Sequence, residues 1–217
     1  IRDSSTSVGS EMCIRDRLKN EIEELKNIKN LEIKTRTSVA AYHQYNYLLA
    51  RENLTDHLEA KDKTNKIRQR LLKIRAKKVI LATGALERPL IFNNNDRPGI
   101  MLSSAIKKYS EFYGVACGSK NVFFTNNDSA YESAISLYNK GINVEAIIDI
   151  REQSESKIVK KVKEAGIKIY WSHSIVDTTG YKRLNSISIM KLSNDGTSVT
   201  GSKISISCDC LGVAGGW

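Results

Sequence analysis

The sequence has 217 residues, of which 41% are hydrophobic and 27% charged, so its composition is that of a globular protein able to bury a core. Its net charge is +10, but no apolar run approaches the roughly 20 residues that a membrane-spanning helix needs. We therefore expect no membrane association, and the position of the basic residues decides whether nucleic acid binding is a reasonable hypothesis.

The first residues do not have the pattern of a folded domain. Ile1-Arg2-Asp3 returns as Ile14-Arg15-Asp16, and the stretch between the two copies is polar and lacks hydrophobic periodicity. This pattern resembles translated sequencing-adapter sequence, so we expect residues 1–17 to be a non-native artefact or a disordered arm. Because there is no initiator Met and the last apolar strand runs into Gly-Gly, we expect the sequence to be an interior fragment.

The next segment predicts a helix followed by strands. Apolar residues at helical spacing predict a helix over residues 18–29, and residues 31–35 read as a short strand. The β-rich stretches 39–50 and 68–74 flank a polar segment and predict an antiparallel excursion. Residues 77–82 are nearly continuously apolar, which is typical of a strand buried on both faces of a parallel sheet.

Much of the positive charge lies in this part of the chain. Between residues 61 and 78, nine Lys and Arg residues accompany a single acid, Asp62. Basic and apolar side chains are mixed on both faces of the expected strand, which favours a solvated or interface hairpin over a stripe that follows phosphates. Known nucleic-acid-binding motifs are absent, so we expect no nucleic acid partner.

From Gly118 onward the sequence predicts alternating strands and helices. Strands are expected at 121–125, 144–150 and 167–171, with helices at 129–140 and 155–165 between them. This βαβαβ order implies a parallel sheet with right-handed crossovers, the half-unit of a Rossmann-type domain. Residues 187–192 and 204–208 then predict a hairpin whose loop contains Asp195-Gly196.

The stretch Val79-Ile80-Leu81-Ala82-Thr83-Gly84-Ala85 is an apolar strand that runs into a turn of small residues. Such a turn lets the backbone approach a cofactor closely, because no bulky side chain stands in the way. By itself the turn is not specific for any function.

The order of parts is more specific, and it resembles the disulfide-reductase-like flavoproteins. In that family a second nucleotide domain is inserted in a first one, and the strand-Ala-Thr-Gly turn lies against the cofactor of the first domain. We therefore expect an α/β fold, with a partial FAD/NAD(P)-binding Rossmann-like domain over residues 18–114 and an inserted βαβαβ domain over 115–209. Residues 210–217 would be a truncated return strand into the first domain. The resemblance implies six cofactor-binding residues: Ala82, Thr83, Gly84, Ala85, Gly215 and Gly216.

The second domain lacks the usual Gly-x-Gly-x-x-Gly fingerprint. Thr125, Asn127 and Ala130 stand at the three glycine positions. The side chain of Asn127 would occupy the space of a pyrophosphate, and Asp128 would place a negative charge beside it. Asp149 follows the second strand, where a ribose-binding carboxylate belongs. We expect this domain to keep the fold without binding NAD(P) in the usual way.

Three runs resemble the alpha subunit of heterotetrameric sarcosine oxidase: RAKKVILATGALERPL at 75–90, NNDRPGIML at 94–102 and TNNDSAY at 125–131. The resemblance covers residues 18–217. It implies that sarcosine is oxidised at FAD in a partner beta subunit, giving glycine, hydrogen peroxide and a one-carbon unit for tetrahydrofolate.

The alpha subunit would contribute an NAD site, part of an FMN interface and a folate domain that this fragment lacks, and would assemble with the beta and smaller subunits. We expect NAD binding and subunit assembly from this chain, no catalytic residue in it, and no activity from the fragment alone.

The cysteines and the catalytic motifs bear on the alternatives. Cys13, Cys117, Cys208 and Cys210 include no Cys-x-x-Cys, which argues against a reductase with a redox-active disulfide, and they lack the spacing of a metal site. Free thiols without a signal peptide favour a reducing, cytoplasmic setting. A subunit of a related FAD/NAD(P)-dependent amine or opine dehydrogenase remains an alternative, as does a non-catalytic basic binding module.

Overall fold

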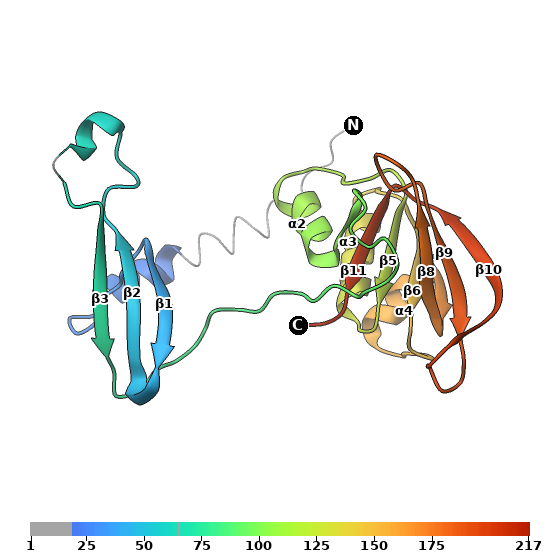
Figure 1. The fold of residues 1–217 in the computed structure, drawn as a ribbon, viewed down its shortest axis with the longest axis horizontal. Helices are drawn as coiled ribbons and strands as arrows, with labels where there is room; N and C mark the ends of the chain where they lie inside the picture. The colour runs from blue at the N-terminus through green and yellow to red at the C-terminus, as the bar shows by residue number, and fades with distance from the viewer. Residues whose placement is uncertain (1–18, 65) are drawn as a thin grey trace. The chain divides into compact units, whose positions relative to one another are not determined.

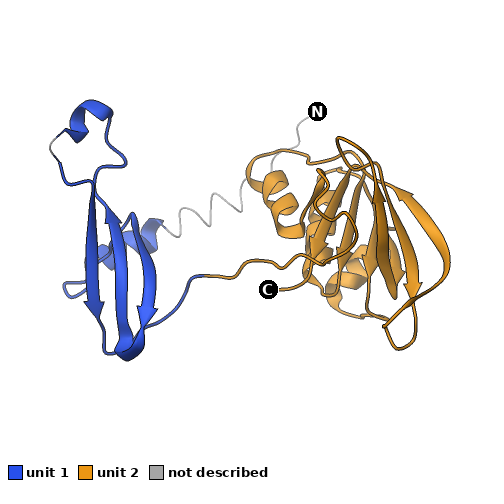
Figure 2. Ribbon diagram, in the orientation of Figure 1, with its two compact units in different colours: residues 1–83 blue, residues 84–217 orange. Residues whose placement is uncertain are grey.

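The computed structural model describes residues 19–64 and 66–217. The chain divides into two compact units, Ile1–Thr83 and Gly84–Trp217 (Figure 2). The artefact or arm expected at residues 1–17 lies outside the described residues.

The first unit is built on a three-stranded antiparallel sheet, ordered β1-β2-β3 (Figure 1). This confirms the predicted antiparallel excursion, and residues 19–26 are helical as expected. Residues 31–34 are not a strand: Arg36 has a positive φ of 50°, which interrupts extended backbone, and pairing begins only where Thr37 lies opposite Glu52. The elements are β1 (Thr37–His43), η1 (Gln44–Asn46), β2 (Tyr47–Asn53), η2 (Ala60–Lys63) and β3 (Gln69–Arg75).

The expected buried strand at residues 77–82 does not form. Residues 78–92 contain neither helix nor strand, and Ile80 and Leu81 are 91% and 68% exposed. A parallel strand requires a neighbour with which to exchange backbone hydrogen bonds, and no strand of the described residues pairs with this segment. Its apolar sequence indicated a preference for burial without identifying the partner.

The second unit contains a five-stranded parallel sheet with the order β4-β11-β5-β6-β7 (Figure 1). The βαβαβ prediction is confirmed, as is the hairpin of β9 and β10, whereas β4, α2 and β8 were not predicted. A smaller antiparallel sheet is ordered β10-β9-β8. The elements are β4 (Ile100–Leu102), α2 (Ser103–Phe112), β5 (Asn121–Thr125), α3 (Ser129–Asn139), β6 (Val144–Asp149), α4 (Lys157–Glu164), β7 (Lys168–Trp171), β8 (His173–Thr179), β9 (Ser186–Leu192), β10 (Val199–Ser207) and β11 (Cys210–Ala214).

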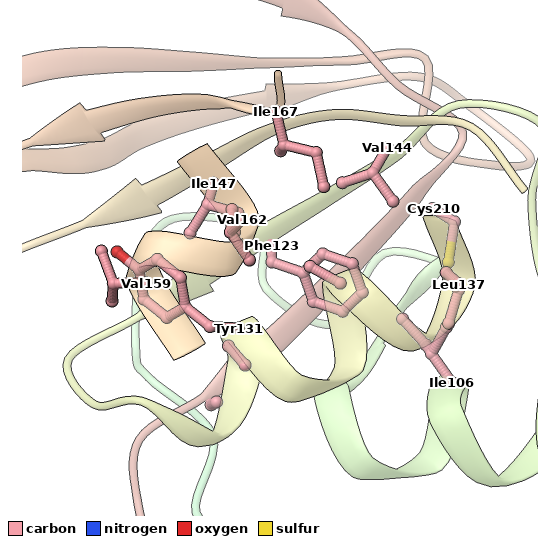
Figure 3. Packing of buried hydrophobic residues seen from close by; sticks show 13 residues of the cluster. Ile106, Phe123, Tyr131, Leu137, Val144, Ile147, Val159, Val162, Ile167 and Cys210 are labelled. Atoms are coloured by element: carbon pink, nitrogen blue, oxygen red, sulfur yellow. The ribbon is translucent and has the colours of Figure 1, made fainter. Parts of the chain in front are cut away.

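Both faces of the parallel sheet are buried, as its apolar strands require. Phe123 of β5 packs on one face with side chains of α2, α3 and α4 (Figure 3). Its neighbours Val122 and Phe124 point to the other face and pack against residues of β8 and β9. The helices therefore cover one side of the sheet and the antiparallel strands the other, so the Rossmann-like α/β fold class is confirmed.

The last strand and the division into units differ from the expected boundaries. Strand β11 is wholly buried and pairs in parallel with β4 and with β5, so it lies inside the sheet of the second unit instead of returning to another domain. The units separate between Thr83 and Gly84, not near residue 114, because residues 100–112 supply β4 and α2 to that same sheet. Among the described residues no helix is long and apolar enough to cross a membrane.

Candidate functional site

The small-residue turn predicted to bind a cofactor lies at the junction of the two units. Ala82 and Thr83 end the first unit, Gly84 and Ala85 begin the second, and all four are exposed. Gly84 has φ +72°, a left-handed conformation that favours glycine. A methyl group placed on Gly84 would meet no atom of the described residues within 4 Å, apart from its chain neighbours. A methyl group at Gly84 would therefore meet backbone strain but no steric conflict with the described residues.

Gly215 and Gly216 are held against the segment that follows Gly84. The backbone N–H of Arg88 donates to the Gly216 carbonyl at 2.7 Å, and the N–H of Gly215 donates to the Arg88 carbonyl at 2.6 Å. A methyl group on Gly215 would lie 2.8 Å from that carbonyl oxygen, so only glycine fits there. Backbone hydrogen bonds thus join the chain after Gly84 and Ala85 to Gly215 and Gly216, the two parts of the second unit that contain predicted site residues.

The segment between Gly84 and Arg88 is anchored by a buried carboxylate, which the sequence analysis did not identify. Glu87 is 4% exposed, and its Oε2 accepts the backbone N–H of Ser104, in the first turn of α2, at 2.8 Å. A carboxylate is favourable at the positive end of a helix. Glu87 therefore fixes the chain between Gly84 and Arg88 to the body of the unit.

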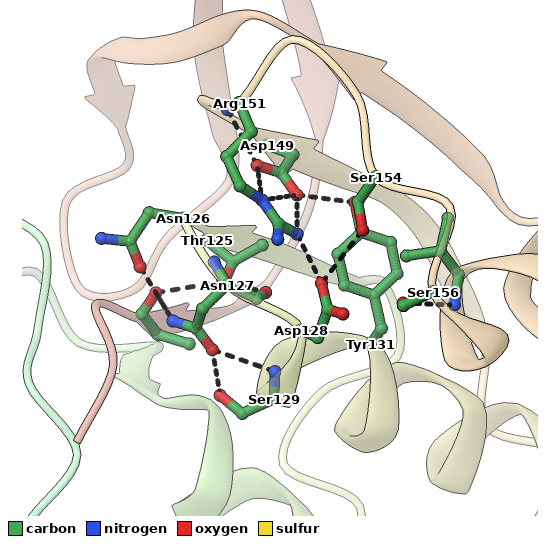
Figure 4. Close-up of polar contacts among 12 residues, drawn as sticks. Thr125, Asn126, Asn127, Asp128, Ser129, Tyr131, Asp149, Arg151, Ser154 and Ser156 are labelled. Atoms are coloured by element: carbon green, nitrogen blue, oxygen red, sulfur yellow. Dashed lines mark hydrogen bonds and ion pairs between the residues drawn. The ribbon is translucent and has the colours of Figure 1, made fainter.

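The loop at the dinucleotide fingerprint position of the second unit is filled by its own side chains (Figure 4). Asn127 Oδ1 accepts the backbone N–H of Ser129 at 2.9 Å and the Ser129 hydroxyl at 2.6 Å. Ser129 is the first residue of α3, so an amide oxygen occupies the helix N-terminus where a pyrophosphate would bind. Thr125 Oγ1 accepts the Asn127 N–H at 3.0 Å and donates to the Asn127 carbonyl at 2.8 Å.

The carboxylate expected at a ribose is also engaged within the chain. Asp149, whose side chain is fully buried, accepts from Arg151 Nη2 at 2.7 Å and from the Tyr131 hydroxyl at 2.8 Å (Figure 4). Arg151 Nη2 lies 2.8 Å from Asp128 as well. Hydrogen bonding to Asp149 raises the pKa of Arg151, and burial together with Asp149 raises that of Tyr131, so the former stays charged and the latter protonated.

These contacts decide how well the loop fits a dinucleotide. The Ser129 N–H is used by Asn127, and Asp149 is paired with Arg151, so a ligand would have to break both interactions. Asp128 adds a carboxylate beside the position of the phosphates. The residues present at this loop do not fit a pyrophosphate.

Two of the three described cysteines, Cys208 and Cys210, lie in the core, and Cys117 is partly buried against it. Cys208 and Cys210 are buried on opposite sides of the parallel sheet, and burial raises the pKa of each thiol to about 12. Within residues 19–64 and 66–217, no group of His, Cys, Asp and Glu side chains could hold a metal ion.

Comparisons with known proteins add a family relationship. No protein-family model matches the chain. It is 38% identical over 184 residues to sarcosine oxidase subunit alpha of Corynebacterium sp. (strain P-1), a match that covers 84% of this chain and 19% of that protein. The same subunit of Corynebacterium sp. (strain U-96) is 34% identical over 182 residues, again covering 84% of this chain and 19% of the relative. The chain therefore spans about a fifth of the length of these relatives.

The fold is also found in a solved structure. The crystal structure of T. acidophilum thioredoxin reductase matches with a TM-score of 0.53 at 21% identity, covering 68% of this chain and 47% of that one. At this identity the match supports the fold alone.

Proposed function

Since the chain is related over most of its length to a segment of the sarcosine oxidase alpha subunit, we propose that it contributes to an NAD site and to subunit assembly in an enzyme of that type. The enzyme would be an oxidoreductase acting on a CH–NH group. It would demethylate sarcosine to glycine, transfer the one-carbon unit to tetrahydrofolate and form hydrogen peroxide.

In this proposal the chemistry takes place outside the chain. A beta subunit would hold FAD and the substrate, and FMN would lie at the interface of the two subunits. We expect no catalytic residue in this chain. Their contribution is a scaffold that positions backbone against a cofactor.

The observation that carries the proposal is the pairing of Arg88 with Gly215 and Gly216, which joins the chain after Gly84 to the Gly-Gly segment. The turn at Gly84 is left-handed and has no side chain at that position, which is the local geometry that lets a backbone approach a nucleotide closely. The loop at Asn127 is the opposite case, because its own side chains fill it. We therefore assign the NAD contribution to the turn and no dinucleotide to the loop.

The test is Gly84→Ala in the complete alpha subunit assembled with its partners. The added methyl enters the space proposed for NAD, so we expect NAD content per alpha chain, measured by chromatography after denaturation, to fall at least fivefold. Gly196→Ala is the matched control, because Gly196 has φ +68° and a methyl there also meets no described atom within 4 Å. It introduces similar backbone strain in the β9–β10 hairpin and should leave NAD content unchanged.

Two outcomes would contradict the assignment. Unchanged NAD content in Gly84→Ala would show that the turn does not contact NAD. Loss of NAD in Asn127→Ala, with Gly84→Ala silent, would place the nucleotide at the loop instead.

A further inference from the structure

The first unit contains a cavity that the proposed function does not use. It has a volume of about 540 Å³ and lies where β2 ends and β3 begins, beside the chain that connects them. That connection extends beyond the end of the sheet (Figure 1). Four basic side chains line the cavity: Arg51, Lys63, Lys66 and Arg68.

No acidic side chain of residues 19–64 and 66–217 lies within ion-pair distance of these four cations. None of them forms an ion pair with another described residue, although neighbouring basic residues such as Arg70 do. The cavity has one acidic side chain, Asp56, and the Nε of Arg36 lies 3.2 Å from its carboxylate. The negative charge of Asp56 is therefore already balanced from outside the lining. Like charges gathered around one cavity repel one another unless an anion is present.

The remaining lining is polar and suited to hydrogen bonding. Asn53 and Gln69 face each other across the paired strands, and Gln69 Nε2 donates to Asn53 Oδ1 at 2.8 Å. This bond fixes the two amides and leaves the carbonyl of Gln69 and the NH₂ of Asn53 for other partners. Thr55 contributes a further hydroxyl-bearing side chain to the lining, and it is 5% exposed.

We propose that this cavity binds a small molecule that carries more than one phosphate group. A single carboxylate would leave most of the four positive charges uncompensated, whereas a diphosphate matches several of them. Two of the cations are arginines, whose guanidinium groups bind phosphate oxygens in pairs. The volume lies within the range of about 300–1,000 Å³ that is usual for small-molecule sites. The basic groups surround one cavity instead of forming a stripe, which favours a compact anion over nucleic acid.

The experiment uses the whole chain and inorganic pyrophosphate as the probe, with binding measured by titration calorimetry at physiological salt. The double variant Lys63→Gln/Arg68→Gln removes two cations from the lining, and we expect the dissociation constant to rise at least tenfold. Lys73→Gln/Lys77→Gln is the control, because both side chains are exposed, lie in the same unit and do not line the cavity. It lowers the net charge equally and should change binding less than twofold.

Three results would overturn the proposal. Absence of pyrophosphate binding to the unaltered chain at millimolar concentration would exclude the site. Equal weakening in both double variants would show that net charge, not the cavity, is responsible. A single-stranded oligonucleotide that binds more tightly than pyrophosphate, and is weakened equally by both variants, would indicate an extended basic surface. Circular dichroism checks that each variant is folded, and Lys66→Gln alone gives an independent measurement at the same lining.

Discussion

Replacing Arg151 by Met tests whether the filled loop of the second unit is held together by its charges. Arg151 Nη2 lies 2.7 Å from Asp149 and 2.8 Å from Asp128, and its own side chain is 29% exposed. The substitution keeps the aliphatic bulk and removes the guanidinium. Asp149, fully buried, would then retain the Tyr131 hydroxyl at 2.8 Å and the backbone N–H of residue 151 at 2.9 Å.

The expected loss of stability follows from the remaining partners. Removing one member of a buried ion pair costs about 3–5 kcal/mol, because the other charge is left uncompensated. The lower end, about 3 kcal/mol, applies here since Asp149 keeps two hydrogen bonds and Arg151 is partly exposed. For a unit of this size that loss corresponds to a fall of about 10 °C in Tm.

Urea unfolding of the chain, followed by circular dichroism, measures the change in the free energy of unfolding. Lys203→Met is the control: Lys203 lies 3.7 Å from Asp177, and the side chains are 52% and 36% exposed, so this pair should contribute less than about 0.5 kcal/mol. If Arg151→Met costs less than about 1 kcal/mol, or no more than the control, the loop does not depend on this ion network and our reading of it is refuted.

Three further predictions concern the second unit. Because burial raises the pKa of Cys208 and Cys210 to about 12, neither should react with a thiol reagent at neutral pH until the chain unfolds, and rapid labelling of either in the native state would contradict this. Partial burial alone would raise the pKa of Asp209, but hydrogen bonds from two backbone N–H groups outweigh it and lower the pKa below its ordinary 3.8. The stabilising contribution of Asp209 is therefore present above pH 3.8 and is lost as the pH falls through the folded-state pKa. Asp209→Asn should flatten the acid limb of the stability–pH curve, and an unchanged slope would contradict this. Gly212→Ala would place a methyl 2.6 Å from the ring of Phe123 and should destabilise the unit by about 1–3 kcal/mol in urea unfolding, while an unchanged midpoint would show that the ring can move aside.

The sequence predicted those parts of the fold whose local pattern matches their final environment. Residues 121–125 form β5 as expected, because a short apolar run flanked by turn residues suits a strand buried on both faces. Residues 77–82 also contain a short apolar run, Val79 to Ala82, but they have no partner strand among the described residues and form no strand. β4 was missed because three residues are too short to show a period, and α2 because no side chain caps its start.

The site was predictable to a similar degree. Asn127 could be placed at a phosphate position from the fingerprint spacing, and the structure puts its amide oxygen there. The pairing of Arg88 with Gly215 and Gly216 could not be foreseen, since it joins backbone groups far apart in the chain and leaves no side-chain pattern. The role of Arg151 depends in the same way on two strand ends that meet only in the folded sheet.

The loop at Asn127 shows how such a fold can be kept without a bound pyrophosphate. A helix N-terminus presents N–H groups and partial positive charge, which a phosphate would otherwise satisfy. Here Asn127 Oδ1 supplies the acceptor, and Arg151 is shared between the carboxylates of Asp128 and Asp149, so one negative charge remains beside the loop. Replacing Asn127 by glycine would therefore expose the Ser129 N–H without creating an anion site, because the carboxylate of Asp128 remains beside it and Arg151 stays bound to both acids. Opening the loop to a dinucleotide would require changes at Asn127 and Asp128 together, which is why we assign the NAD contribution to the turn at Gly84.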